Sequence, residues 1–267
     1  MQRSAEQITI KTPEELALMR EAGRIVAIAH EEMRKAVEPG VSTWELDQIA
    51  ETVIRDHGAV PAFVGYPKQD SPDFPATITA SINEELVHGI PSKDRVLKEG
   101  DIISLDTACH YNGYVGDAAH TWAVGEIPAA VQRLIDVAQG ALEAAIAASV
   151  PGNEVSDIAR ATQQYAAKYG YSVAREYTGH GVGQRMHEPP QVPNWWPRKQ
   201  NRRTARANAR LEPGMTLAIE PMIIAGRPDT KELADKWTVV TKDRSLCAHT
   251  EHSIAITTGE AVILTVL

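Results

Sequence analysis

Residues 97–106, LKEGDIISLD, and residues 211–220, LEPGMTLAIE, carry the same pattern at two places in the chain. In each stretch, a turn that ends in glycine leads into an apolar segment that ends in an acid. A short apolar run bounded by a turn is typical of a buried strand. The pattern therefore predicts two matching strands, with Asp106 and Glu220 at equivalent positions.

The helices upstream of these strands repeat as well. Gly40 and Gly152 each follow a proline and open a helix, and another glycine stops that helix eighteen residues further on. A further helix precedes each of these units, and the first of them begins with Thr12 and Glu15 as a capping box. The sequence thus predicts four helices, at about residues 13–37, from Gly40 to Gly58, at about residues 129–149, and from Gly152 to Gly170.

A further matched spacing extends the repeat toward the C-terminus. Asp117 precedes Glu126 by the distance that separates Glu251 from Glu260. Several matched spacings in one order indicate a duplication within one catalytic domain over residues 1–267. The half-repeats would span approximately residues 13–126 and 127–260. We expect an α+β fold with a pseudo-twofold axis, in which two pairs of helices cover one face of a mostly antiparallel sheet.

The acids of the two halves are predicted to converge. The dipeptide Asn112-Gly113 between alternating apolar runs predicts a β-hairpin. A two-residue loop there places Asp106 and Asp117 on one sheet face as diagonal neighbours, about 7–8 Å apart. The duplication predicts a matching pair, Glu220 and Glu251. No lysine or arginine adjoins any of the four in sequence, so protons, distant basic groups or cations must neutralise them.

A divalent metal site is the simplest interpretation of these acids, and two ions suit four carboxylates better than one. The alternative is that the acids are scattered over the surface. Three histidines lie in loops rich in glycine or proline, namely His88, His180 and His187. One imidazole among carboxylates favours Mn, Fe or Co over a zinc site built from thiolates.

Several segments together resemble those of type 1 methionine aminopeptidases, and the resemblance covers nearly the whole chain. They are NEELVHGIP at residues 83–91, Asp106 with Asp117, TGHGVG at 178–183 followed by HEP at 187–189, PGMTLAIEPM at 213–222, and TEHSI at 250–254. The resemblance implies the pita-bread fold and two divalent metal ions, which could be Mn, Fe, Co or Zn. It also implies removal of the initiator methionine from nascent proteins and peptides when the second residue is small.

The resemblance also implies roles for individual positions. The metal ligands would be Asp106, Asp117, His180, Glu220 and Glu251. Asp106 would bind one ion, His180 and Glu220 the other, and Asp117 and Glu251 would bridge the two. Glu220 would also be the general base for the metal-bound water. The substrate backbone and its developing gem-diolate would contact His88 and His187. The methionine pocket would be lined by Phe63, Tyr66, Thr79, Met186 and Trp237.

The chain departs from the family pattern around this pocket. Met186 replaces an aromatic residue that is common in the family, and Val87 replaces a common cysteine. Residues 69–75, QDSPDFP, form an insertion. These differences alter the pocket but none of the implied metal ligands.

Two other functions are open from the sequence. A proline-specific aminopeptidase or prolidase-like hydrolase of the same fold would share the metal motifs. Such enzymes usually carry an extra N-terminal domain, for which the segment before His88 leaves no room beyond the first half-repeat. A non-catalytic binding module on the same scaffold would be expected to have lost ligands, whereas all five are present.

The composition is that of an ordinary globular enzyme, with 267 residues, a formal net charge of −8 and only two cysteines, Cys109 and Cys247. The sequence has neither a disulfide framework nor a secretory signal or membrane-spanning stretch, so we expect a cytoplasmic monomer without membrane contact. Residues 198–210, RKQNRRTARANAR, hold six basic residues and no acid. This segment is either a solvated loop or a transient contact to ribosomal RNA, which would suit an enzyme that acts on nascent N-termini.

Overall fold

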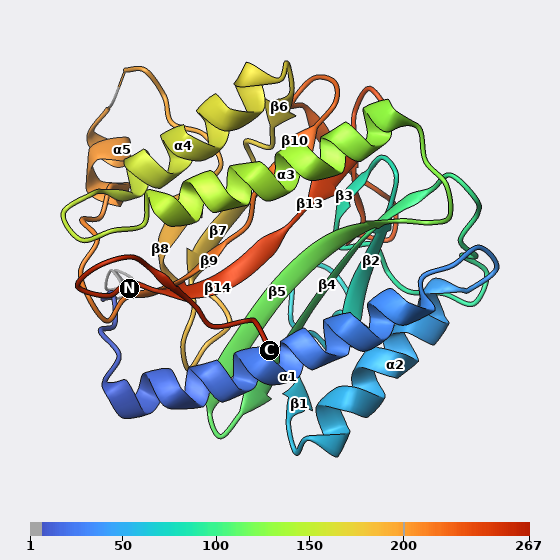
Figure 1. Ribbon diagram of the computed structural model, residues 1–267, viewed down its shortest axis with the longest axis horizontal. Coiled ribbons are helices and arrows are strands. Elements are labelled where there is room, and N and C mark those ends of the chain that lie inside the picture. Colours follow the sequence, from blue (N-terminus) through green and yellow to red (C-terminus); the bar gives the residue numbers. More distant parts are fainter. Residues whose placement is uncertain (1–6, 200) are drawn as a thin grey trace.

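The computed structural model describes residues 7–199 and 201–267, and one large sheet dominates it (Figure 1). The helices are α1 (Pro13–Ala36), α2 (Thr43–Asp56), α3 (Ala129–Ala147), α4 (Val155–Lys168) and α5 (Arg202–Ala207). The strands are β1 (Val60–Pro61), β2 (Ile78–Ile82), β3 (Glu85–Val87), β4 (Ile102–Tyr111), β5 (Tyr114–Ala123), β6 (Ser172–Val173), β7 (Thr178–Gly181), β8 (Glu188–Pro193), β9 (Thr216–Ile219), β10 (Met222–Ile224), β11 (Thr230–Glu232), β12 (Val239–Thr241), β13 (Cys247–His249), β14 (Glu251–Ala255) and β15 (Val262–Ile263). Within these described ranges, no helix combines the length and apolar character that crossing a membrane requires.

Local sequence signals explain where the first two helices begin. At α1, the Thr12 hydroxyl accepts a hydrogen bond from the Glu15 backbone N–H, and the Glu15 carboxylate accepts one from the Thr12 backbone. Ser42 and Glu45 form the same capping box at α2. Helices α1 to α4 confirm the four predicted helices. The short α5, within the basic segment, is not among those predicted.

The two helix pairs share their flanking turns. Gly40 and Gly152, which precede α2 and α4, have φ angles of +100° and +93°. Gly58 and Gly170, which follow these helices, have φ angles of +72° and +82°. These left-handed conformations favour glycine, because it has no Cβ to clash with the backbone. The second helix of each pair is therefore bounded by equivalent turns.

The main sheet has the strand order β1-β4-β5-β14-β9-β7-β8, with β2 also pairing with β4 and β15 with β14. The β4–β5 hairpin confirms the predicted register, since Ala108 pairs with Asp117. Asp106 pairs with Ala119, and Ala119 also pairs with Glu251 of β14. Residues opposite one another share a sheet face, as do residues two apart along a strand. Asp106, Asp117 and Glu251 therefore lie on one face.

Each helix pair builds its own part of the core. Helices α1 and α2 pack with β4 and β5 in one buried cluster, whereas α3 and α4 pack with β9 and β14 in another. In the view of Figure 1, both helix pairs lie in front of the strands. Helix α1 approaches β5 very closely at Gly116, where an added Cβ would lie 2.5 Å from the Ala22 carbonyl carbon and the Gly23 nitrogen.

Replacing Gly116 with alanine should destabilise the protein, because the new methyl group would push α1 away from β5. Overpacking of this kind costs about 1–3 kcal/mol, which should lower the urea midpoint of unfolding. Gly259→Ala is the matched control, since the nearest atom to its added Cβ is Thr257 Oγ1 at 4.0 Å. Equal midpoints for the two variants would contradict the close approach of α1 to β5.

Candidate metal centre

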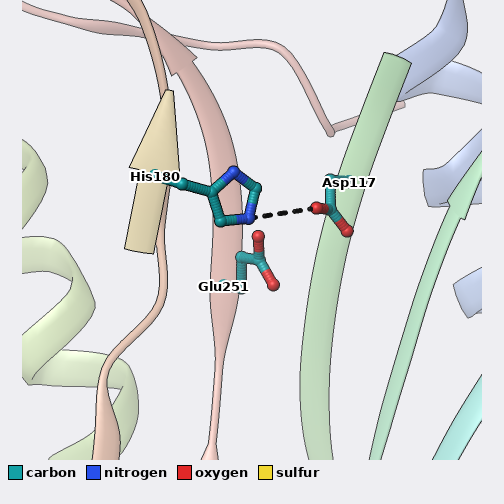
Figure 2. Close-up of side chains that lie close together, drawn as sticks. All are labelled: Asp117, His180 and Glu251. Atoms are coloured by element: carbon teal, nitrogen blue, oxygen red, sulfur yellow. Dashed lines mark ion pairs between the residues drawn. The ribbon is translucent and has the colours of Figure 1, made fainter. Parts of the chain in front are cut away.

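Three buried side chains from three strands converge at the centre of the sheet (Figure 2). Asp117 comes from β5, His180 from β7 and Glu251 from β14, and their potential ligand atoms all lie within 4.8 Å of one another. His180 Nε2 lies 3.7 Å from Asp117 Oδ2. Oxygen and imidazole donors at this separation can share one cation.

Glu220 and Asp106 extend this cluster. Glu220 directly follows β9, and its Oε1 lies 3.5 Å from His180 Nε2. Asp106, on β4, lines the same cavity. One oxygen each of Asp106, Asp117 and Glu251 is buried and has no hydrogen-bond partner among the described residues. Buried oxygens without partners are costly, and such oxygens fit the coordination shell of a divalent cation.

Burial dominates the electrostatics of these acids. Burial, and next the charge of Asp117, raises the pKa values of Asp106, Glu220 and Glu251 well above the ordinary range. Burial also raises the pKa of Asp117 to about 7. No lysine or arginine is among the described residues that line the cavity. In the absence of a cation, the carboxyl groups therefore retain protons near neutral pH.

His180 presents a lone pair to the acids. Its Nδ1 donates a hydrogen bond to the Gly181 carbonyl oxygen at 2.9 Å, which leaves Nε2 unprotonated in the neutral ring. Burial lowers the pKa of His180 to about 3. The glycines around it let β7 fit between its neighbours, because a Cβ on Gly179 would lie 2.4 Å from the Ala218 oxygen and one on Gly181 would lie 2.3 Å from the Pro189 oxygen. The orientation of His180 is that of a metal-binding imidazole.

The cluster opens into a cavity of about 140 Å³. Its lining residues are Phe63, Tyr66, Phe74, Thr79, His88, Asp106, Asp117, His180, Met186, His187, Glu220, Trp237 and Glu251. Every residue predicted for the site is in this set. Phe74 is the one that the sequence prediction missed. It belongs to residues 69–75, the segment predicted to be an insertion, and a single aromatic residue in a polar, proline-containing loop gives no periodic signal.

Aromatic side chains form an apolar wall of the cavity. Phe74 packs edge-on against Phe63 and Trp237, with ring centroids 6.3 Å and 5.1 Å away. The indole Nε1–H of Trp237 donates to the Pro72 carbonyl oxygen at 2.9 Å. The segment 69–75 therefore supplies both a wall residue, Phe74, and the hydrogen bond that orients Trp237.

Two further histidines face the cavity. Tyr66 Oη lies 2.5 Å from His187 Nδ1, and the His187 ring centroid lies 4.2 Å from that of His180. His88 has a φ angle of +62° and packs edge-on against Trp237. Burial lowers the pKa of His88 to about 4 and also lowers the pKa of His187. Both rings are therefore neutral at pH 7, and each offers one donor and one acceptor.

One more histidine lies close to two of the acids. His249 Nε2 lies 3.8 Å from Glu220 Oε2 and 3.8 Å from Glu251 Oε2. The sequence analysis did not single out His249, because only the folded arrangement of β13 and β14 brings its ring toward both carboxylates.

The sequence profile of metallopeptidase family M24 matches residues 17–258. The chain belongs to metallopeptidase family M24. Among similar proteins, methionine aminopeptidase 1 of Bacillus subtilis is 51% identical over 258 residues, which cover 97% of this chain and 99% of the relative. The buried Asp117, His180 and Glu251 are compatible with the metal that a metallopeptidase requires.

Solved structures of similar proteins share the fold. The methionine aminopeptidase of Thermotoga maritima has a TM-score of 0.91 at 40% identity, and the match covers 98% of this chain and 100% of that chain. The Xaa-Pro dipeptidase of Bacillus anthracis has a TM-score of 0.75 at 25% identity, covering 96% of this chain but 61% of that chain. These likenesses confirm the pita-bread fold that the sequence resemblance implies.

Metal binding should release protons at pH 7, because a cation displaces the protons that the carboxyl groups with raised pKa values retain. For the same reason, the apparent affinity for Mn²⁺ should weaken as the pH falls from 8 to 6. Titration calorimetry in two buffers with different ionisation enthalpies measures the protons released. An affinity independent of pH, with no proton release, would contradict this electrostatic description.

Proposed function

We propose that this M24 metallopeptidase is a methionine aminopeptidase that removes the N-terminal methionine of nascent proteins and peptides when the second residue is small. The observation that carries the proposal is one cavity in which an aromatic wall adjoins a cluster of carboxylates and histidines. The nearly full-length identity to proteins named methionine aminopeptidase supports it. The products would be free methionine and a shortened chain.

In this proposal, two divalent ions, which could be Mn, Fe, Co or Zn, bind to the acids and to one histidine. The residues that hold them are Asp106, Asp117, His180, Glu220 and Glu251. The partnerless buried oxygens of this cluster and the lone pair of His180 support the assignment. When bound, such ions lower the pKa of water and polarise the carbonyl group of the scissile bond.

Glu220 is the proposed general base, and His88 and His187 are the proposed contacts to the substrate. Once a bound cation has displaced its proton, the Glu220 carboxylate, whose Oε1 lies 3.5 Å from His180 Nε2, would accept a proton from the attacking water and pass it to the leaving amine. If the Tyr66 hydroxyl donates to His187 Nδ1, the His187 proton resides on Nε2. That proton is then available to the carbonyl oxygen of the substrate, where negative charge develops.

The apolar side of the cavity is the proposed methionine pocket. Its proposed lining comprises Phe63, Tyr66, Thr79, Met186 and Trp237, together with Phe74 from the insertion. Aromatic rings make favourable contacts with a thioether sulfur, which supports methionine as the first residue. Because the apolar wall and the histidines line one small cavity, we propose that selection of a small second residue is steric.

The Mn²⁺-loaded protein should cleave Met-Ala-Ser and leave Ala-Pro intact. Asp106→Asn should lower kcat/KM by roughly 100-fold or more, because weaker metal binding removes the activation of water. Asp136→Asn, on the exposed face of α3, is the control and should retain activity.

Other outcomes of this assay would select a different function. Cleavage of Ala-Pro alone would identify a proline-specific hydrolase of the same fold. Metal binding without hydrolysis of either peptide would indicate a binding module. Full activity in Asp106→Asn would refute the assignment of Asp106 as a metal ligand.

We also propose that the basic segment 198–210 makes a transient ribosome contact. The exposed Arg198 and Lys199 lie before α5, and the Arg175 guanidinium lies 5.2 Å from the centroid of the Trp195 ring beside them. Some members of the segment lie outside the described residues, namely Gln200 and the side chains of Arg202, Arg203 and Arg206. A cluster of six cations in a chain with a net charge of −8 supports a local site for phosphate groups.

Replacing Arg202, Arg203 and Arg206 with glutamate should weaken salt-sensitive co-sedimentation with ribosomes, because each substitution removes a cation that can bind a phosphate group. Turnover of Met-Ala-Ser should stay unchanged. The control is reversal of exposed basic residues on α1 and α2, namely Arg34, Lys35 and Arg55. Unaltered co-sedimentation of the first variant would refute the ribosome contact.

For the chain as a whole, we propose one catalytic domain over residues 1–267, of which residues 1–6 and Gln200 lie outside the described part. It consists of half-repeats at approximately 13–126 and 127–260. The proposed ligands support this division, because both halves contribute to one centre. We also propose that the protein is a monomer and that it acts in the cytoplasm, where nascent chains emerge.

A further inference from the structure

A buried ion pair joins the N-terminal segment to the loop that carries His187. Lys11 Nζ donates to Glu188 Oε2 at 2.8 Å, and 5% of each side chain is exposed. Lys11 lies just before α1, whereas Glu188 directly follows His187 at the start of β8. A segment distant in the sequence is thus linked to a residue adjacent to the cavity.

Glu188 connects several parts of the backbone through its two oxygens. Thr9 Oγ1 donates to Oε2 at 2.8 Å, and Lys11 Nζ also donates to Thr9 Oγ1. The backbone N–H of Arg185 donates to Oε1 at 3.1 Å. The carboxylate therefore closes the loop across residues 185–188 and fastens it to the N-terminal segment.

The surroundings of the pair are shaped to admit it. The backbone N–H of Lys11 donates to the Gly214 carbonyl oxygen at 2.8 Å, which anchors the segment beside the sheet. A Cβ on Gly183 would lie 2.7 Å from Lys11 Cε and from both carboxylate oxygens of Glu188. The Gly183 carbonyl oxygen in turn accepts a hydrogen bond from the Val115 N–H at 2.8 Å. Both ends of the loop are therefore held.

Net stability alone is a weak reason to bury such a pair, because the loss of hydration largely offsets the attraction between the charges. A buried pair does restrict geometry, since each charge tolerates few alternative positions without its partner. The loop between Gly183 and Glu188 carries Met186 and His187, which both line the cavity. Its position therefore sets the position of two groups beside the substrate.

We propose that Lys11 is a positioning residue for His187, acting through its ion pair with Glu188. The inference rests on the proposed function for its effect on catalysis. Lys11 is the ion-pair partner of Glu188 in the part of the chain that the structure describes, and without its ammonium group the Glu188 carboxylate turns toward solvent. It then loses the hydrogen bond from Arg185, and His187 loses its alignment with the scissile carbonyl group.

Lys11→Met tests this role, because methionine keeps the length and apolar contacts of the side chain without its charge. The value of kcat for Met-Ala-Ser should fall roughly 10- to 100-fold, because a small misplacement of a group that contacts the substrate lowers the rate by factors of this size. Mn²⁺ affinity should be unchanged, since Lys11 contacts none of the proposed ligands. Hydrogen exchange should increase locally over residues 183–188. Lys35→Met is the control and should change none of these, because exposed Lys35 pairs on the surface of α1 with the half-exposed Glu32.

The double variant Lys11→Met with Glu188→Gln separates positioning from general destabilisation. The neutral amide needs no counterion and can still accept the hydrogen bond from Arg185, so kcat should recover substantially. A double variant that folds like the wild type but retains the full loss of kcat would overturn the proposal. So would an active Lys11→Met variant with unchanged exchange over residues 183–188.

The exchange measurement also separates this inference from the proposed function. The wild-type protein could fail to cleave Met-Ala-Ser while Lys11→Met still increases hydrogen exchange at residues 183–188 only. In that case the proposed function fails and the positioning of the loop by Lys11 stands. If the wild-type protein cleaves the peptide and Lys11→Met does so equally well, the proposed function stands and the role of Lys11 fails.

Discussion

The confinement of four carboxyl groups in one largely buried cavity is the constraint on which the rest of this structure depends. Removal from water and mutual repulsion raise the pKa values of Asp106, Glu220 and Glu251 well above the ordinary range. The acids stay together because the surrounding strands hold them, and the cation that a metallopeptidase binds would relieve their repulsion. His180 also suits a cation at this place, because its neutral ring presents the Nε2 lone pair to the acids.

The rigidity that this arrangement needs comes from close backbone packing around the central strands. Strand β14 pairs with both β5 and β9, so it joins the two halves where the acids meet. Glycines at Gly116, Gly179 and Gly181 let neighbouring backbones approach within distances that a Cβ would block. Glycine weakens an isolated strand. At these positions it nevertheless allows the close backbone packing that holds the strands around the cavity.

Different parts of the candidate site were predictable to different degrees. Asp106 and Asp117 follow from a hairpin whose register the Asn112-Gly113 turn determines, and the structure confirms that register. Glu220 and Glu251 follow only through the internal repeat. Phe74 and His249 give no such signal, because neither the path of the loop at residues 69–75 nor the placement of the short strand β13 beside the acids has a sequence period. The roles of individual residues follow from the family resemblance, because the spacing of the residues does not define those roles.

The sequence by itself determined the helices, their caps and turns, the central hairpin and the face on which its acids lie. These features depend on residues close in the chain, through side-chain periodicity, hydrogen bonding at helix ends and the turn preferences of glycine. Only the tertiary structure decided which nitrogen of His180 faces the acids, how Phe74 completes the apolar wall, and that Lys11 pairs with Glu188. These contacts join segments far apart in the chain, and their geometry depends on how the whole sheet and its helices pack.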